Sequence, residues 1–127
     1  AYYAFGFEFE QGTFHTRLYL PENLLGDLKE VSLAPSPQGS LPWCLARTNI
    51  GRFMVNLRVS IGNALVQGWF DALQKAHDVS WVYDPTLDYY RDYHIQRRYD
   101  GLIFIDNTTA SRPNPNALKT IARRDGL

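Results

Sequence analysis

The chain has 127 residues, of which 45% are hydrophobic and 20% charged, and 13 Lys and Arg balance 13 Asp and Glu. This composition excludes a disordered segment, because disordered chains combine low hydrophobicity with high net charge. The neutral balance argues against a protein that mainly binds the phosphate backbone of nucleic acid. The single cysteine, Cys44, excludes an internal disulfide framework. The sequence also lacks a membrane-length apolar run and a signal-peptide pattern. We therefore expect a cytoplasmic protein that binds neither nucleic acid nor membrane.

Two strands are predicted at the start of the chain. Residues 2–9 and 13–20 each show an alternation with a period of two, which is typical of β-strands. We expect them to form an antiparallel hairpin whose turn is residues 9–12, where Gly12 can adopt a positive φ. Gly6 in the first strand indicates that another group packs closely against it.

The middle of the chain predicts three short elements. A strand is expected at residues 28–33, a helix at 41–47 and another strand at 53–58. Ser40 can cap the helix, because its hydroxyl can accept a hydrogen bond from an amide of the first turn.

The clearest helical pattern covers residues 64–76. Its predicted apolar stripe consists of Leu65, Val66, Trp69, Phe70 and Leu73. A strand is expected at 79–83, so that residues 53–83 form a β-α-β unit with a right-handed crossover. Residues 101–105 form a continuous apolar run, which favours a central strand covered on both faces. A last short helix is expected at 117–124. The predicted fold class is therefore α/β, with a mixed sheet, an N-terminal hairpin, a β-α-β unit and flanking helices.

The motifs for catalysis are sparse. The three histidines, His15, His77 and His94, do not have the spacing of a metal site. We interpret His77 as a structural residue at the end of the long predicted helix, where a positive imidazole favours the helix dipole. Ser60 lies between a predicted strand and a helix but lacks the first glycine of a nucleophile elbow. We expect no catalytic residue, no metal and no cofactor in this chain.

Several segments of the sequence, taken in order, resemble the C-terminal part of the erythromycin esterase-like hydrolases, a family also described as succinoglycan biosynthesis proteins. The matching segments are Gly6-Phe7-Glu8-Phe9 with Gly12 and Phe14, Pro35, Pro37 and Gly39-Ser40-Leu41, Leu57-Arg58, Tyr83 with Pro85 and Tyr90, Tyr99-Asp100-Gly101-Leu102-Ile103-Phe104-Ile105, Thr108-Thr109-Ala110, and Arg112-Pro113.

The resemblance implies a mixed sheet with helices and a hydrolase that opens macrolide lactones in the best-known members, where a histidine activates water without a metal. The essential histidines, arginine and glutamates of the family lie in the portion that precedes this segment, and no residue here matches their motifs. We therefore expect residues 1–113 to be the C-terminal α/β segment of such a domain, inactive alone, and residues 114–127 to be a basic tail. The chain also begins within a strand-like segment, which favours a fragment. Its expected partners are the N-terminal portion of the same domain or a second copy, and a small-molecule ester substrate.

The candidate site residues follow from the predicted strand ends, because ligands in open α/β sheets gather beyond the carboxyl ends of the strands. We expect the wall of a cleft to include Glu10, Gln11 and Phe14, and a loop near its mouth to include Tyr83, Asp84 and Tyr90.

An alternative from another class is a free-standing binding module that stacks the Tyr-rich loop 89–94 on a sugar or another planar ligand. A large exposed apolar surface would favour the hydrolase segment over the module.

Overall fold

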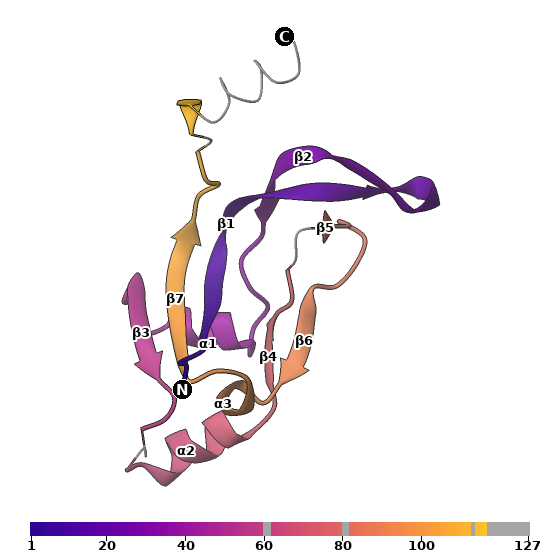
Figure 1. Cartoon of the computed structure of the whole chain (residues 1–127). Coiled ribbons are helices and arrows are strands. Elements are labelled where there is room, and N and C mark those ends of the chain that lie inside the picture. The colour runs from indigo at the N-terminus through magenta and orange to yellow at the C-terminus, as the bar shows by residue number, and fades with distance from the viewer. Residues whose placement is uncertain (60–61, 80–81, 113, 117–127) are drawn as a thin grey trace.

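The computed structural model describes residues 1–59, 62–79, 82–112 and 114–116 of the chain (Figure 1). The strands are β1 (Phe5–Leu20), β2 (Leu24–Leu33), β3 (Arg52–Asn56), β4 (Gln74–His77), β5 (Val82–Tyr83), β6 (Tyr90–Tyr93) and β7 (Gly101–Thr108). The helices are α1 (Leu41–Ala46), α2 (Ala64–Asp71) and α3 (Ile95–Arg98), with a 3-10 turn at Pro21–Asn23. The helix expected at 117–124 lies outside the described residues.

A mixed sheet forms the centre of the molecule, which confirms the predicted α/β class. Its strand order is β2-β1-β7-β3, and β5 pairs with β1 away from this path. The β1 strand runs parallel to β7 and to β5 but antiparallel to β2, while β3 runs antiparallel to β7. A second, two-stranded sheet is made by β4 and β6.

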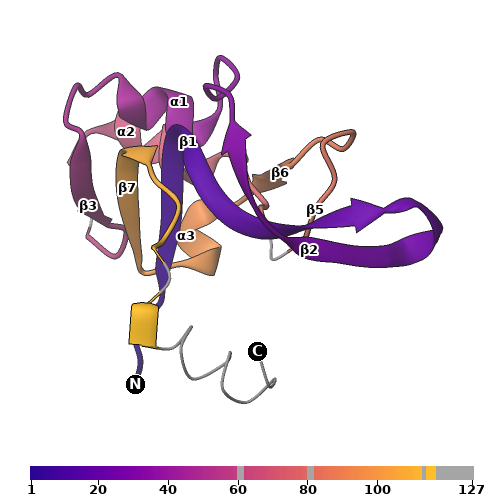
Figure 2. The ribbon, with the colours of Figure 1, turned by 90° about the horizontal axis from the view of Figure 1, so that it is seen from above.

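The predicted hairpin of residues 2–9 with residues 13–20 does not form, although the chain does begin with a different hairpin, made by β1 and β2. The β1 strand continues through residues 9–12, and its antiparallel partner is β2, reached through the turn at Pro21–Asn23. Gly12 does have a positive φ of 133°, yet it lies inside the strand, where an added Cβ would collide with the backbone of Thr108. Gly12 is therefore needed because β7 packs closely against it, and it does not form a turn. Figure 2 shows the β1–β2 ribbon curving away from β7 and β3.

The β7 strand has the central position that its apolar sequence predicts. It lies between β1 and β3, and both Leu102 and Phe104 are completely buried. The core on this side of the sheet is completed by Leu41 and Leu45 of α1, Phe70 of α2, Ile95 of α3, Leu57 and Ala76. Ser40 caps α1 as predicted, because its Oγ accepts a hydrogen bond from the Trp43 amide at 3.4 Å. The core therefore joins all three described helices to the central strand.

The predicted β-α-β unit is not formed by residues 53–83. The β3 and β5 strands run in opposite directions, since β3 is antiparallel to β7 whereas β5 is parallel to β1. The α2 helix also ends at Asp71, and Gln74–His77 forms β4 where the sequence pattern predicts that the helix continues to residue 76. Leu65 is 86% exposed and only Phe70 of α2 is buried, so the helix buries less of its apolar stripe than predicted.

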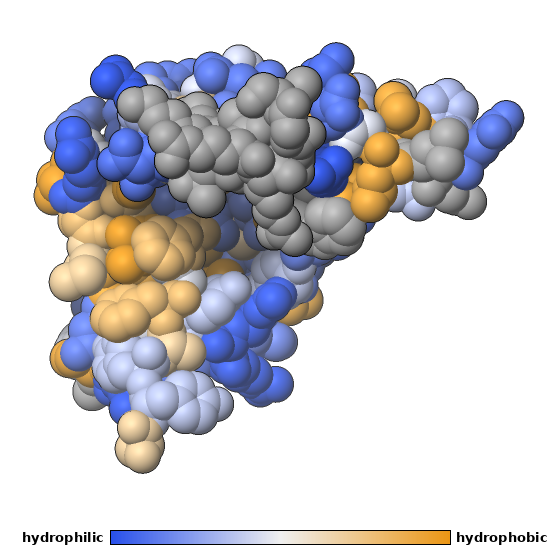
Figure 3. All heavy atoms as spheres, turned by 45° about the horizontal axis from the view of Figure 1, so that its top comes forward, coloured by the Kyte–Doolittle hydropathy of each residue, from blue (hydrophilic) through white to orange (hydrophobic). Residues whose placement is uncertain are grey.

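The other face of the central strands exposes large apolar side chains. Ile103 of β7 is paired with Phe7 of β1 on one side and with Met54 of β3 on the other, so the three residues lie in one row across the sheet. Phe7 is 65% and Met54 68% exposed, and Phe5 lies next to them on β1. We call Phe5, Phe7, Met54 and Ile103 the outer apolar face. Figure 3 shows hydrophobic side chains gathered on one face of the molecule.

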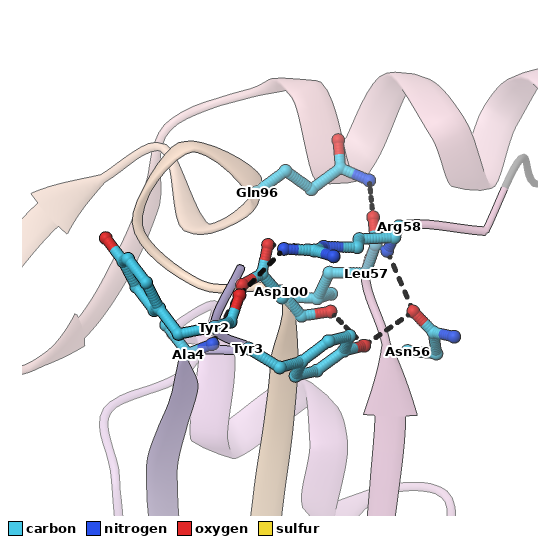
Figure 4. Close-up of polar contacts among 8 residues, drawn as sticks. All are labelled: Tyr2, Tyr3, Ala4, Asn56, Leu57, Arg58, Gln96 and Asp100. Atoms are coloured by element: carbon cyan, nitrogen blue, oxygen red, sulfur yellow. Dashed lines mark hydrogen bonds and ion pairs between the residues drawn. The ribbon is translucent and has the colours of Figure 1, made fainter.

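A polar cluster lies where the three central strands β1, β7 and β3 begin or end (Figure 4). Asp100, just before β7, accepts hydrogen bonds from Arg58 Nε at 2.6 Å and from the Ala4 amide at 2.8 Å. The Tyr3 hydroxyl donates to the Asp100 carbonyl at 2.7 Å and lies 2.8 Å from Asn56 Oδ1. The hydrogen bond from Arg58 is the main reason that the pKa of Asp100 lies below its usual value. Arg58 and Asp100 therefore have a structural role here.

No helix among the described residues is long and apolar enough to cross a membrane.

Candidate functional site

A cleft with a volume of about 360 Å³ lies between β1 and the β4–β6 sheet. This volume falls in the range of small-molecule sites, which is roughly 300–1,000 Å³. Its aromatic lining consists of Phe7, Phe9, Phe14, Tyr93 and Tyr99, and its polar lining includes Glu8, His77, Asp78 and Arg98. The cleft therefore combines ring surfaces with a few polar groups, as ligand sites do.

A buried carboxylate and imidazole meet at the wall of the cleft. Glu8 Oε2 lies 3.2 Å from His77 Nδ1, and the two side chains are only 5% and 4% exposed. The His77 backbone N–H also points at the same oxygen, at 3.4 Å. Phe9, the next residue of β1, stacks on the imidazole with ring centroids 4.7 Å apart. The imidazole is therefore held both by hydrogen bonds and by ring contact.

The hydrogen bonds continue from His77 to Tyr90 and beyond. The Tyr90 hydroxyl lies 2.7 Å from His77 Nε2 and 3.1 Å from Ser36 Oγ. Ser36 in turn donates to the Glu10 carbonyl at 2.8 Å. Burial raises the pKa of the Tyr90 hydroxyl, and the nearby carboxylates of Glu10 and Glu8 add to this effect. The phenol is therefore protonated at neutral pH and available as a donor.

Strand pairing explains how these residues meet. His77 at the end of β4 and Tyr90 at the start of β6 are directly opposite each other in the antiparallel register, so their side chains can touch. Glu8 comes from the central sheet, and Ser36 from the segment between β2 and α1. The site therefore exists only where the small sheet packs against β1.

The structure places the candidate residues Glu10 and Tyr90 in this hydrogen-bond chain. Among the described side-chain atoms, Glu10 Oε2 is the one buried oxygen or nitrogen without a hydrogen-bond partner. Gln11 is not part of the chain of contacts: it pairs with Asn107 of β7.

The other three candidate residues, Phe14, Tyr83 and Asp84, are connected by ring contacts and by a hydrogen bond to Tyr89. Phe14 lines the cleft and lies 6.3 Å from Phe9 and 6.1 Å from Tyr83, between ring centroids. Tyr83 stacks on Tyr89 at 4.8 Å, and the Asp84 amide donates to the Tyr89 hydroxyl. These residues support the cleft, and of the six candidates Phe14 is the one that lines it within the described part of the chain.

Sequence reasoning missed Glu8 and His77. His77 was expected at a helix end, but it belongs to β4, and its partner is Glu8 rather than a helix dipole. The available signal was Glu8 itself, a charged residue in an otherwise apolar strand.

The predicted loop 89–94 is largely the strand β6, and its rings contact protein groups. Tyr90 contacts His77, and the guanidinium carbon of Arg98 lies 3.8 Å from the centroid of the Tyr93 ring. No group of three or more His, Cys, Asp or Glu side chains within the described ranges could hold a metal ion.

Fold and site together define a mixed α/β protein in which an aromatic cleft contains a carboxylate–imidazole–phenol chain of hydrogen bonds. The sequence model of the erythromycin esterase family matches residues 1–108, and the chain therefore belongs to that family, as its resemblance predicted. The matched range ends within the predicted segment 1–113. No match is found among curated proteins.

Two solved structures are similar to this chain. One is a protein from Bacillus cereus with 14% sequence identity, and the other is described as a succinoglycan biosynthesis protein, with 17% identity. Each superposes with a TM-score of 0.66 and covers 83% of this chain but 24% of its own. At these identities the likeness establishes the fold alone. The chain spans about a quarter of the length of these two structures.

Proposed function

We propose that this chain is the C-terminal scaffold and substrate-lining portion of an ester hydrolase. Its water-activating groups belong to another portion of the same domain, and its substrate is a small-molecule ester or a macrolide lactone. The observation that carries the proposal is the family match over residues 1–108 in a chain that covers only 24% of its solved relatives.

The outer apolar face supports this proposal. Exposed apolar patches that include large side chains mark interaction surfaces, and Phe7 and Met54 are both more exposed than buried. The rest of a hydrolase domain is the partner that the family match favours. The cleft supports the lining role, because it offers ring surfaces and buried polar groups to a bound substrate.

The first test is hydrolysis of p-nitrophenyl acetate by the purified chain. We expect no turnover above the buffer rate, and the same result for His77→Gln. Turnover by the chain itself that is lost in His77→Gln would show that the catalytic group lies in these residues, and the proposal would be wrong.

The second test uses the reading frame that encodes the chain. The proposal requires that this frame also encodes a histidine-bearing hydrolase portion upstream of Ala1; a stop codon followed by a start at Ala1 would contradict it. In the longer protein, Phe14→Ala is expected to lower kcat/KM roughly tenfold, because the ring lines the cleft. Leu28→Ala is the control, since Leu28 is 62% exposed on β2. Equal kcat/KM values for the two variants would refute the lining role.

A further inference from the structure

One oxygen of the Glu8 carboxyl group accepts no hydrogen bond from the residues that the structure describes. Both hydrogen bonds that Glu8 accepts from described residues end on Oε2, from the ring and the backbone N–H of His77. The other oxygen, Oε1, accepts no hydrogen bond from these residues. It is also not one of the fully buried side-chain atoms without a hydrogen-bond partner. Glu8 is 5% exposed and lines the cleft, so the cleft is the space from which Oε1 can be reached.

The orientation of this carboxylate is set before any ligand arrives. The ring Nδ1 and the backbone N–H of His77 both contact Oε2, so this side of the carboxyl group is held by the protein. The other ring nitrogen, Nε2, contacts the Tyr90 hydroxyl at 2.7 Å, and Phe9 stacks on the ring. Because His77 is held in this way on two edges and one face, Glu8 Oε1 stays directed at the cleft without a further loss of side-chain entropy.

The charges around the cleft favour a neutral ligand. The Arg98 guanidinium covers the Tyr93 ring, and its pKa is raised first by the hydrogen bond to Tyr93 and also by the charge of Asp78. A cationic ligand would therefore meet Arg98, while an anionic ligand would meet Glu8 and Asp78. A neutral hydroxyl group can donate to Glu8 Oε1 without either repulsion.

We propose that the cleft binds a neutral ring compound that has an apolar face and a hydroxyl group, with the hydroxyl donating to Glu8 Oε1. Phe14, which lines the cleft, supplies ring surface for the apolar face, and the volume of about 360 Å³ suits a single substituted ring. The inference names the substrate class of the lining portion, and it rests on the proposed function only for the link to ester hydrolysis.

The experiment is an NMR titration of the isotope-labelled full chain with two matched probes. Cyclohexanol carries the ring and the donor, whereas cyclohexyl methyl ether keeps the ring and the oxygen but has no O–H. We expect cyclohexanol to bind roughly tenfold more tightly, because the hydrogen bond to a charged acceptor is lost with the ether. The signals that shift should be those of cleft residues such as Phe14 and His77. Equal affinities, tighter binding of cyclohexylammonium, or no shift of cleft signals would each overturn the proposal.

A pair of variants tests the role of Glu8 directly. Glu8→Gln keeps the size of the side chain but removes its charge, and it should abolish the preference for the alcohol. Glu30→Gln makes the same change at an exposed position of β2 and should keep the preference. If Glu8→Gln fails to fold, the comparison of alcohol and ether on the unmodified chain still decides. The readout is binding and not turnover, so failure of this inference and failure of the proposed function are separate results.

Discussion

Gly6→Ala tests whether the contact between β1 and Tyr99 depends on the absence of a side chain. An added Cβ would lie 2.5 Å from Tyr99 Cδ2 and 2.6 Å from Cε2, which is closer than real Cβ atoms approach. The aromatic ring must therefore move, and overpacking of this kind costs about 1–3 kcal/mol. Replacing a strand glycine recovers about 0.5–1 kcal/mol of backbone entropy. We expect a net loss of about 1–2 kcal/mol in the free energy of unfolding.

The assay is urea denaturation of the variant beside a matched control. Gly68 lies in α2, and nothing would lie within 4 Å of a Cβ added there. Gly68→Ala should therefore stabilise the chain by about 1 kcal/mol, because alanine is the better helix former. The same substitution at the two positions should change the midpoint in opposite directions.

A double-mutant cycle identifies the cause. In a Tyr99→Leu background the smaller side chain leaves room for the new methyl group, and the cost of Gly6→Ala should fall below about 0.5 kcal/mol. An equal cost of Gly6→Ala in both backgrounds would show that Tyr99 is not responsible. Stabilisation by Gly6→Ala, as in Gly68→Ala, would refute the steric reasoning altogether.

Two further predictions concern the core and the polar cluster. Phe104→Ala should lower the free energy of unfolding by about 3–5 kcal/mol, since the ring is completely buried. Met54→Ala, at a 68% exposed position, should lower it by less than about 1 kcal/mol. Equal losses in urea denaturation would show that the two faces of the sheet are not buried differently. Asp100 has a pKa below its usual 3.8, chiefly through Arg58, so its contribution to stability is complete above that value and is lost as the pH falls through the lowered pKa. Urea midpoints at about pH 7 and about pH 3 should therefore differ less in Asp100→Asn than in the unmodified chain, and an unchanged difference would rule out this linkage.

Local patterns in the sequence predicted several elements correctly. The apolar run at 101–105 indicated a central strand, and β7 is central. The expected cover on both faces is not present among the described residues, because Phe7 and Met54 beside Ile103 are exposed. Ser40 indicated the start of α1, and Gly6 indicated a close contact. Each of these features depends on one residue type and its immediate neighbours along the chain.

The errors arose where a distant segment determined the local structure. Gly12 reads as a turn residue, but β7 packs against its backbone and keeps it in a strand. Residues 74–77 continue a helical pattern, yet they gain strand pairing with β6 and leave the helix. Propensity is a weak influence in both places, and tertiary contacts override it.

What the sequence by itself determined is the α/β class, the central strand, the Ser40 cap and, through its resemblance, the family. The tertiary structure alone decided the site. Glu8 is 69 positions from His77, and Tyr90 is 13 positions beyond it, so no local spacing relates the three residues. They meet because the β4–β6 sheet packs against β1, where the buried Oε2 of Glu8 contacts the ring and the backbone N–H of His77.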